Sequence, residues 1–312
     1  MPKQENRQIG TVLKRMKGFY YIDLEGTVCL CRIKGNLFQG KSRKNSVAVG
    51  DRVEFDPNAS EDAGWIYKVL PRSSELSRPA KEGRIEQTLV SNVDNLLIVS
   101  AIKMPAFRTG MVDRFLITAQ RGHLHPIIIV NKTDLAETWE IEEIRETYET
   151  LGYQILPTST VSGVGLDSLK ALLRKRTSVL SGHSGVGKSS LLKALFPGWE
   201  IKIGSVSDTT QKGRHTTTNS EMYRLPDGGY VVDTPGIREL GLHLLSPEDL
   251  DLYFVEFQDD RLHCKYKGCS HRHEPHCAVR EGVAEKRIAP LRYQSYCSIF
   301  DSLLDSSPKK AK

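Results

Sequence analysis

The stretch Gly182-His183-Ser184-Gly185-Val186-Gly187-Lys188-Ser189 matches the phosphate-loop pattern GxxxxGK[ST] at every fixed position. The apolar run 178–181 before it predicts a short buried strand, and the run 190–196 after it predicts the first turns of a helix. Glycines let such a loop curl so that backbone N–H groups point at phosphate oxygens, where the helix N-terminus adds positive charge. The residues expected to contact the nucleotide here are Gly182, His183, Ser184, Gly185, Val186, Gly187, Lys188, Ser189 and Ser190.

Two side chains of this loop have distinct expected roles. Lys188 is expected to reach the β- and γ-phosphates, and the Ser189 hydroxyl is expected to bind Mg²⁺. The alternative is a glycine-rich turn that binds nothing. The strand before the loop and the helix after it argue against that alternative, because this context is what the motif requires.

A second pattern comes earlier in the chain. Asn131-Lys132-Thr133-Asp134 follows the apolar run 126–130 and matches the NKxD signature with which GTPases read guanine. The carboxylate of Asp134 can accept both the N1–H and the N2 amino group of guanine, whereas adenine has no N1–H. We expect Asn131 to bond the purine edge and neighbouring loops, and the stem of Lys132 to lie over the base. Ser159 is expected near the base oxygen, although an ordinary turn before a helix explains this residue almost as well.

Two further patterns after the phosphate loop suit Mg²⁺ and the γ-phosphate. One threonine of the string 213–218 is expected to close on Mg²⁺, and we take Thr217 while leaving Thr216 and Thr218 open. A predicted hairpin then ends in Asp233-Thr234-Pro235-Gly236, which matches DxxG. Asp233 is expected to hold Mg²⁺ through water, and the Gly236 N–H is expected to contact the γ-phosphate.

The order of these motifs is inverted. Ordinary GTPases begin with the phosphate loop and reach NKxD last, whereas here NKxD comes first. Strand and helix patterns alternate through this region, which predicts a mostly parallel sheet with helices on both faces. We therefore expect a circularly permuted P-loop GTPase domain at 73–242. Such a permutation is physically inexpensive where chain ends lie close together.

The first part of the chain has a different pattern. Five short alternating segments within 1–72 predict a small antiparallel barrel of the OB type, expected to bind RNA. A purely structural barrel with a solvated basic loop explains its charge equally well. Cys29 and Cys31 share one strand face, which favours core packing over metal binding, and the polar segment 71–79 predicts a linker. The basic residues in or beside the third strand are Arg32, Lys34, Lys41, Arg43 and Lys44.

Composition limits the class of protein. A chain of 312 residues with 39% hydrophobic and 26% charged residues predicts a globular protein of two or three domains. The net charge of +6 is compatible with a polyanionic partner. There is no apolar run of eighteen residues and no pattern typical of a signal peptide. We therefore expect a cytoplasmic protein without membrane attachment. Separately, we expect a monomer.

Four potential metal ligands gather near the C-terminus. Cys264, Cys269, His271 and Cys277 match the three thiolates and one imidazole of a closed structural zinc site, although the spacing alone is moderately specific. This cluster and a predicted amphipathic helix over 293–304 place a mainly helical zinc-binding domain at 243–312. The histidines that compete for the imidazole position are His263, His273 and His276.

The barrel, the inverted motifs and the cysteine cluster together resemble a known family. It is the ribosome small-subunit-dependent GTPase A family of circularly permuted GTPases, and the resemblance covers essentially the whole chain. It implies that Cys264, Cys269, His271 and Cys277 bind one structural Zn²⁺. It also implies GTP hydrolysis to GDP and phosphate with Mg²⁺. The implied partner is the small ribosomal subunit with its rRNA, whose late maturation the protein would assist and which would stimulate hydrolysis.

The catalytic residues are less certain than the binding residues. Ile237 stands where many GTPases place a water-orienting glutamine, which predicts slow intrinsic hydrolysis. His215 is our candidate for positioning the water, with Lys188 at the phosphates, although a solvated loop histidine is an equal alternative and Arg214 could instead neutralise charge. Another hypothesis is an RNA-binding module that holds GTP as a structural ligand with negligible turnover. A third is metal-dependent RNA hydrolysis.

Overall fold

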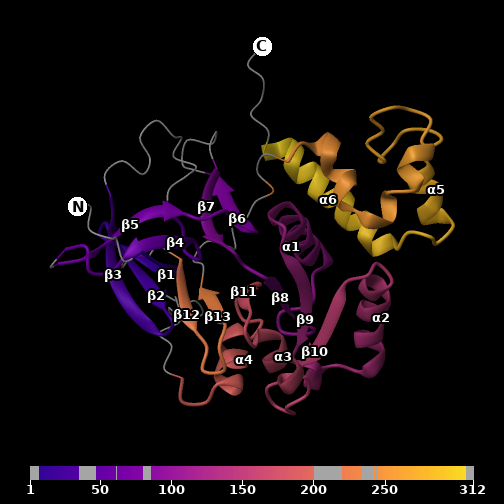
Figure 1. The fold of residues 1–312 in the computed structure, drawn as a ribbon. Helices are drawn as coiled ribbons and strands as arrows, with labels where there is room; N and C mark the ends of the chain where they lie inside the picture. The colour runs from indigo at the N-terminus through magenta and orange to yellow at the C-terminus, as the bar shows by residue number, and fades with distance from the viewer. Residues whose placement is uncertain are drawn as a thin grey trace, which may run out of the picture.

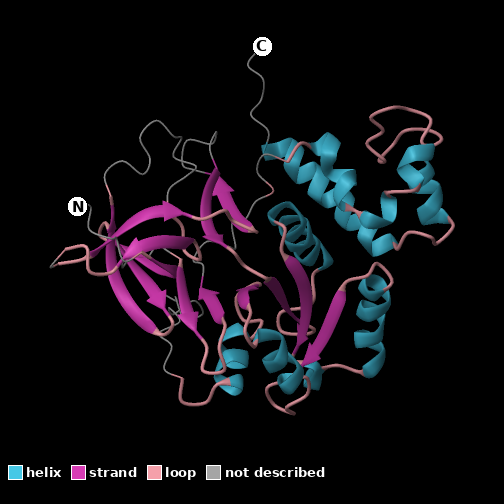
Figure 2. Cartoon of the chain, viewed as in Figure 1, coloured by secondary structure: helices cyan, strands magenta, loops and turns pink. Residues whose placement is uncertain are grey.

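The computed structural model describes residues 7–34, 47–60, 62–79, 86–199, 220–233, 242 and 245–306. Figure 1 shows a barrel near the N-terminus, an α/β layer beside it and a helical region near the C-terminus. Figure 2 shows that strands dominate the first part and that the last part contains helices and loops. Within the described ranges, no helix combines the length and apolarity that a membrane crossing requires.

Five strands close the predicted OB-type barrel. Strands β1, β2, β3, β5 and β4 pair in that order, and β4 pairs back onto β1. Val12, Ile22 and Phe55 are fully buried in its core, and Cys31 packs with them. The core position of Cys31 agrees with the prediction that Cys29 and Cys31 are packing residues. The strands are β1 (Gln8–Met16), β2 (Phe19–Leu24), β3 (Thr27–Ile33), β4 (Arg52–Asp56) and β5 (Gly64–Val69).

The basic surface expected on the barrel is only partly described. The Arg32 guanidinium lies 4.3 Å from the centre of the Phe19 ring, and the Lys34 ammonium lies 4.7 Å from that of Tyr67. The described barrel surface therefore carries cations beside aromatic rings, a combination that is common in proteins that bind single-stranded nucleic acid. Lys41, Arg43 and Lys44 lie outside the described residues.

The prediction of a linker at 71–79 is wrong for its second half. Residues Glu75–Pro79 form strand β6, which pairs antiparallel with β7 (Glu86–Ser91). Leu76 is 1% exposed and anchors β6 in the core of the α/β layer. A single apolar residue among polar ones is a weak strand signal, and the pairing partner lies beyond the segment, so the local pattern could not predict the strand.

The α/β layer has the predicted parallel sheet, in the order β10-β9-β8-β11-β13-β12. Strands β8 to β11 and β13 run parallel, and only β12 is antiparallel to its neighbour β13. All seven residues of β8 are buried, which explains why its sequence is a continuous apolar run. The strands are β8 (Asn95–Ala101), β9 (His125–Asn131), β10 (Gln154–Thr158), β11 (Thr177–Ser181), β12 (Glu221–Arg224) and β13 (Tyr230–Asp233).

Helices cover both faces of this sheet, as predicted. Successive side chains of β8 alternate between two cores, so that Leu96 and Ile98 pack with α1 and α2 while Leu97 and Val99 pack with α3 and α4. The helices are α1 (Thr109–Gly122), α2 (Thr138–Glu149), α3 (Leu166–Leu173) and α4 (Lys188–Leu195).

The barrel and the α/β sheet are joined into one eleven-stranded sheet. Strand β1 pairs antiparallel with β12, with Lys14 opposite Glu221, and the ammonium of Lys14 lies 3.0 Å from the Glu221 carboxylate. Beside this pairing, the Tyr230 hydroxyl donates a hydrogen bond to Asp23 of the barrel. The junction between these parts is therefore backbone pairing reinforced by side chains.

The C-terminal region packs on α1 through α6 (Pro290–Ser306). Arg292 is 1% exposed and donates to Glu256 at 2.6 Å and to Asp113 of α1. The Tyr148 hydroxyl of α2 donates to the same Asp113 carboxylate at 2.9 Å. The remaining elements are η4 (Pro247–Tyr253), η5 (Val255–Phe257), η6 (Asp260–His263) and α5 (Ala278–Ala284).

Replacing Arg292 with methionine is expected to lower the free energy of unfolding by about 3–5 kcal/mol, because two buried carboxylates lose their cation. Denaturation in urea, followed by a probe in the C-terminal helices, measures this loss. The half-exposed Arg145, which pairs with Glu142 and Glu149 on one face of α2, supplies the control. Arg145→Met should change the free energy of unfolding by less than about 1 kcal/mol. Equal losses in both variants would contradict a structural role for the buried network.

Candidate nucleotide pocket and metal cluster

The predicted phosphate loop occupies residues 182–187, between the end of β11 and the start of α4. Gly182 has a φ of 147° and Gly187 a φ of 98°, values that disfavour other residues. A Cβ on Gly182 would lie 2.0 Å from the carbonyl oxygen of Val99, and one on Gly187 would lie 2.3 Å from Nδ2 of Asn131. The two glycines are therefore needed both for the loop conformation and for its close packing against β8 and β9.

The Lys188 ammonium folds back over this loop. Its Nζ donates hydrogen bonds to the carbonyl oxygens of Gly182 at 2.8 Å and His183 at 2.9 Å. These carbonyl groups hold the cation at the mouth of the loop, where the N-terminus of α4 also faces. A phosphate oxygen placed there would meet a fixed positive charge and the backbone N–H groups of the first helical turn, which point toward the loop.

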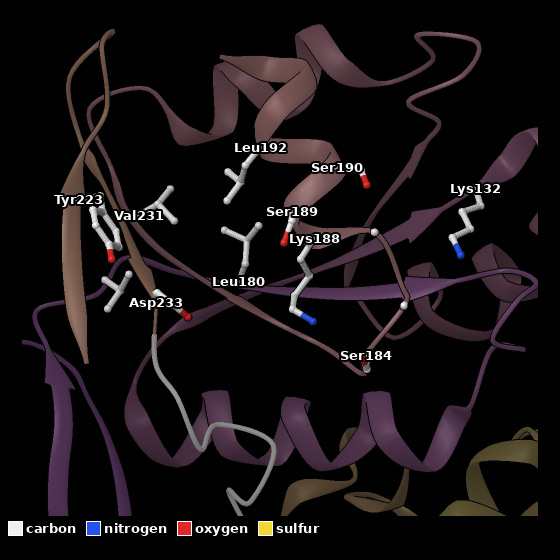
Figure 3. Close-up of a pocket in the computed structure, with 13 residues that line it drawn as sticks. Lys132, Leu180, Ser184, Lys188, Ser189, Ser190, Leu192, Tyr223, Val231 and Asp233 are labelled. Carbon is white, nitrogen blue, oxygen red and sulfur yellow. The ribbon is translucent and has the colours of Figure 1, made fainter. Parts of the chain in front are cut away.

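One pocket collects parts of three predicted motifs (Figure 3). Lys188 and Ser189 enter it from the phosphate loop, Asp233 from the end of β13, and Lys132 from the segment after β9. The predicted residues that line this pocket are Lys132, Ser184, Gly185, Gly187, Lys188, Ser189, Ser190 and Asp233. The other predicted nucleotide-binding residues that the structure describes do not line this pocket. They are Asn131, Thr133, Asp134, Ser159, Gly182, His183 and Val186.

Hydrogen bonds join the NKxD segment to the phosphate loop. Asn131 is 1% exposed, and its Nδ2 donates to the carbonyl oxygen of Val186 at 2.8 Å. The hydroxyl of Thr158 donates to Oδ1 of Asn131 at 3.0 Å, and the hydroxyl of Thr133 donates to the Thr158 carbonyl at 3.1 Å. The two motifs, 55 residues apart along the chain, are therefore held together by a fully buried amide.

Thr158 fixes the orientation of the Asn131 amide and was not among the predicted site residues. The available signal was a hydroxyl residue directly before Ser159, at the position where β10 ends. Since the C-terminal ends of parallel strands meet at one edge of a sheet, this position adjoins the end of β9.

Asp134 and Ser159 meet each other beside the pocket. The Ser159 hydroxyl donates to Oδ1 of Asp134 at 2.5 Å, and the backbone N–H groups of Val161 and Ser162 donate to that hydroxyl oxygen at 3.1 Å. Ser159 is completely buried, whereas Asp134 is exposed. This arrangement orients the Asp134 carboxylate while leaving it accessible to a base.

Lys132 has an anchor that its sequence pattern did not suggest. The residue has a left-handed backbone with φ of 63°, and its Nζ donates to the carbonyl oxygen of Met104. The neighbouring Pro105 approaches the phosphate loop at Gly185, where an added Cβ would lie 3.7 Å from the proline ring. The segment after β8 thus borders the pocket between the NKxD segment and the phosphate loop.

Several predicted residues lie outside the described parts of the chain. They comprise the switch threonine, its two alternatives, the candidate water-positioning histidine and the glycine of DxxG. These residues are His215, Thr216, Thr217, Thr218 and Gly236.

The four predicted metal ligands form one cluster. The ligand atoms of Cys264, Cys269, His271 and Cys277 all lie within 4.8 Å of one another. Sγ of Cys264 lies 3.9 Å from Sγ of Cys277, and the two sulfurs lie 3.5 and 3.4 Å from Nδ1 of His271. Tetrahedral zinc separates two sulfurs by about 3.8 Å and a sulfur from a nitrogen by about 3.5 Å, so these residues fit zinc. The cluster formed by the described residues contains none of the competing histidines His263, His273 and His276.

The surroundings of the cluster prepare His271 as a ligand. Its Nδ1 faces the thiols, while its buried Nε2 has no hydrogen bond and lies 3.5 Å from the Asp251 carboxylate. A carboxylate beside the distal nitrogen orients a ligating imidazole. Burial and the neighbouring Cys277 and Cys264 thiols raise the pKa of Cys269 to about 12. The thiolate form therefore needs a cation, which zinc would provide.

Comparisons with known proteins match the whole of this architecture. The RsgA GTPase family model matches residues 69–243, more than half of the chain, and the RsgA N-terminal domain model matches residues 9–66. The small ribosomal subunit biogenesis GTPase RsgA of Chlorobaculum parvum is 41% identical over 308 residues, covering 96% of this chain and 99% of the relative. The protein of that name from Thermotoga maritima is 37% identical over 286 residues, covering 91% and 92%.

Solved structures show the same fold. The crystal structure of YjeQ from Thermotoga maritima aligns with a TM-score of 0.78 at 35% identity, covering 96% of this chain and 99% of that one. The structure of YloQ, described as a circularly permuted GTPase, aligns with a TM-score of 0.73 at 29% identity, covering 99% of both chains. The inverted motif order is therefore confirmed as a circular permutation, and the chain belongs to the RsgA GTPase family.

Proposed function

We propose that this protein is a GTPase that assists late maturation of the small ribosomal subunit. It would hydrolyse GTP to GDP and phosphate, with stimulation by that subunit. The hydrogen bond from the Asn131 amide to the Val186 carbonyl carries the proposal. It ties the segment expected to read guanine to the loop expected to hold phosphate, so that one nucleotide can span both. The printed name of the relatives, small ribosomal subunit biogenesis GTPase, supports the partner.

Each pocket residue has a proposed role. Lys188 would exchange the carbonyl groups of Gly182 and His183 for phosphate oxygens. Ser189 would ligate Mg²⁺ directly, Asp233 would hold it through water, and Thr217 would complete the site. Mg²⁺ held by these residues would supply positive charge beside the phosphate oxygens.

Base recognition is proposed for the NKxD residues. Asp134, oriented by Ser159, would accept the two donors of guanine, and the stem of Lys132 would cover the base. Asn131 would hold the purine edge near the phosphate loop, while Thr133 keeps β9 and β10 together.

The proposed partner is the rRNA of the small subunit, bound by a monomer that also carries one structural Zn²⁺. The barrel contributes cation–aromatic pairs such as Arg32 with Phe19, which suit RNA. The net charge of +6 favours a polyanion.

Turnover of GTP, measured with and without small ribosomal subunits, tests this function. Because Ile237 cannot orient water, we expect slow intrinsic turnover that the subunit accelerates by about 10³–10⁵-fold, the range that supplied transition-state contacts give. Absence of stimulation would instead favour an RNA-binding module with GTP as a structural ligand. Cleavage of RNA that persists in Lys188→Ala would favour metal-dependent RNA hydrolysis.

His215→Ala is expected to reduce subunit-stimulated turnover about 10²-fold while leaving GTP affinity unchanged, because the imidazole is proposed to position water and not to bind nucleotide. Single-turnover hydrolysis with saturating subunits measures the rate, and equilibrium titration measures the affinity. His183→Ala, at a loop position whose backbone rather than side chain contacts Lys188, is the matched control. If the His215 variant hydrolyses GTP as fast as the unmodified protein, the catalytic assignment is wrong and the GTPase assignment stands.

Asp134→Asn is expected to change the base preference of the pocket from guanine to xanthine. The amide cannot accept from both guanine donors, so GTP affinity should fall about 10²–10⁴-fold. Xanthine carries an oxygen in place of the N2 amino group, and the new amide can donate to it, so the affinity for xanthosine triphosphate should rise. Titrations of the two nucleotides measure the ratio. Asp167→Asn, an exposed carboxylate in the first turn of α3, is the control. An unchanged ratio in Asp134→Asn would exclude Asp134 from base recognition.

A further inference from the structure

A second hollow lies at the edge of the parallel sheet opposite the nucleotide pocket, where strands β8 to β11 begin. Its polar wall comes from the residues that start these strands and from the ends of α1 and α3. The side chains that matter for its chemistry are those of Asp94, His123, His125, Gln154, Arg174 and Arg176. Strand β8, with seven residues at about 3.3 Å each, separates the two sites by roughly 20 Å.

The hollow has an excess of hydrogen-bond donors. The only carboxylate among its lining residues, Asp94, accepts the backbone N–H of Thr177 at 2.8 Å and lies 3.6 Å from the Arg176 guanidinium. Arg174, His123 and His125 are exposed. Within the described ranges, their side chains make no hydrogen bond or ion pair. One guanidinium and two imidazoles therefore border the hollow without an acceptor from the part of the chain that the structure describes.

We propose that this hollow binds a phosphate group of the RNA backbone. A guanidinium presents several donors in a fixed fork that matches phosphate oxygens, and phosphate offers acceptors only. The two imidazoles lie on the α1 and β9 side of the hollow and Arg174 lies at the end of α3, so donors approach from two elements. The inference rests on the proposed function, because RNA is the phosphate-rich surface of the proposed partner. It adds to that function an RNA contact made by the α/β layer itself.

Charge reversal at Arg174 tests the site in the full-length protein. Arg174→Glu should weaken binding of a short labelled RNA duplex and of small ribosomal subunits about tenfold at about 0.1 M salt. The slope of log affinity against log salt should decrease by about one, as expected for one lost phosphate contact. Lys175→Glu is the matched control, because it makes the same change in charge at the next residue, which is exposed but does not line the hollow.

The control variant should bind RNA within about twofold of the unmodified protein. Equal weakening in both variants would overturn the proposal, because non-specific attraction between the protein's positive charge and RNA would then explain the loss. Unchanged RNA binding in Arg174→Glu would also overturn it. Ring resonances of His123 and His125 should move on addition of RNA. Movement with inorganic phosphate but not with RNA would assign the hollow to a free anion and overturn the RNA assignment.

The test also separates this inference from the proposed function. Basal GTP turnover of Arg174→Glu should equal that of the unmodified protein, because the hollow lies at the other edge of the sheet. If subunits fail to stimulate GTP turnover while Arg174→Glu alone weakens RNA binding, the proposed function fails and the RNA site stands.

Discussion

Lys188→Ala is expected to abolish measurable GTP hydrolysis and to weaken GTP binding at least about 10²-fold. The ammonium is the one cation that the described residues place at the phosphate loop itself, held there by the carbonyl groups of Gly182 and His183. In the proposed complex it would contact the β- and γ-phosphates, and loss of such a charge-assisted contact removes binding as well as stabilisation of the transition state. Fluorescent nucleotide titration and phosphate release measure the two effects.

The control for this substitution is Lys193→Ala, in the same helix. Lys193 is exposed in the last turn of α4, so its loss removes an equal charge without touching the loop. The GTP affinity and the hydrolysis rate of this variant should lie within about twofold of those of the unmodified protein. Solvent and salt screen a charge at the far end of the helix from the phosphate loop. GTP turnover that survives in Lys188→Ala would show that hydrolysis occurs at another site.

Loss of the metal is the second large effect that we expect. Cys277→Ser should eliminate stoichiometric zinc and unfold the region around the cluster, because Cys277 is 3% exposed and belongs to the core that also contains Phe257 and Tyr296. Structural zinc in small modules contributes about 10–16 kcal/mol, far more than the few local contacts could replace. Metal analysis gives the stoichiometry, and hydrogen exchange locates the unfolded region.

Cys297→Ser is the matched control for the zinc prediction. Cys297 packs against the same core but is not a member of the four-residue cluster. Its variant should retain one zinc per chain and normal hydrogen exchange at α5 and η6. Full zinc content in Cys277→Ser, or zinc loss in Cys297→Ser, would contradict the ligand assignment.

The elements that the sequence predicted well are those with strong local patterns. The apolar run 178–181 predicted the buried strand β11, and the glycine pattern predicted the loop at 182–187, because each of these features is determined within about ten residues. Local pattern could not predict the pairing of Lys14 with Glu221, which are 207 residues apart. The same limit hid β6, which depends on β7 for its partner.

At the nucleotide pocket, too, local sequence patterns were predictable and long-range contacts were not. Motif positions named the residues at the pocket, but the hydrogen bonds that orient them were not predictable. Thr158 holds the Asn131 amide, and the Met104 carbonyl holds Lys132, through contacts between segments that only the folded chain brings together. The cysteine spacing and the family resemblance predicted His271 as the imidazole of the cluster, and the structure places this imidazole among the three thiols.

The pairing of β1 with β12 has a consequence for any shortened form of this protein. Strand β12 is the last strand on its side of the α/β sheet, and β1 of the barrel covers it. Removal of the barrel would leave β12 as an uncovered edge strand with free backbone N–H and C=O groups, which favours intermolecular strand addition and aggregation. The barrel therefore protects the solubility of its neighbour, in addition to any role in RNA binding.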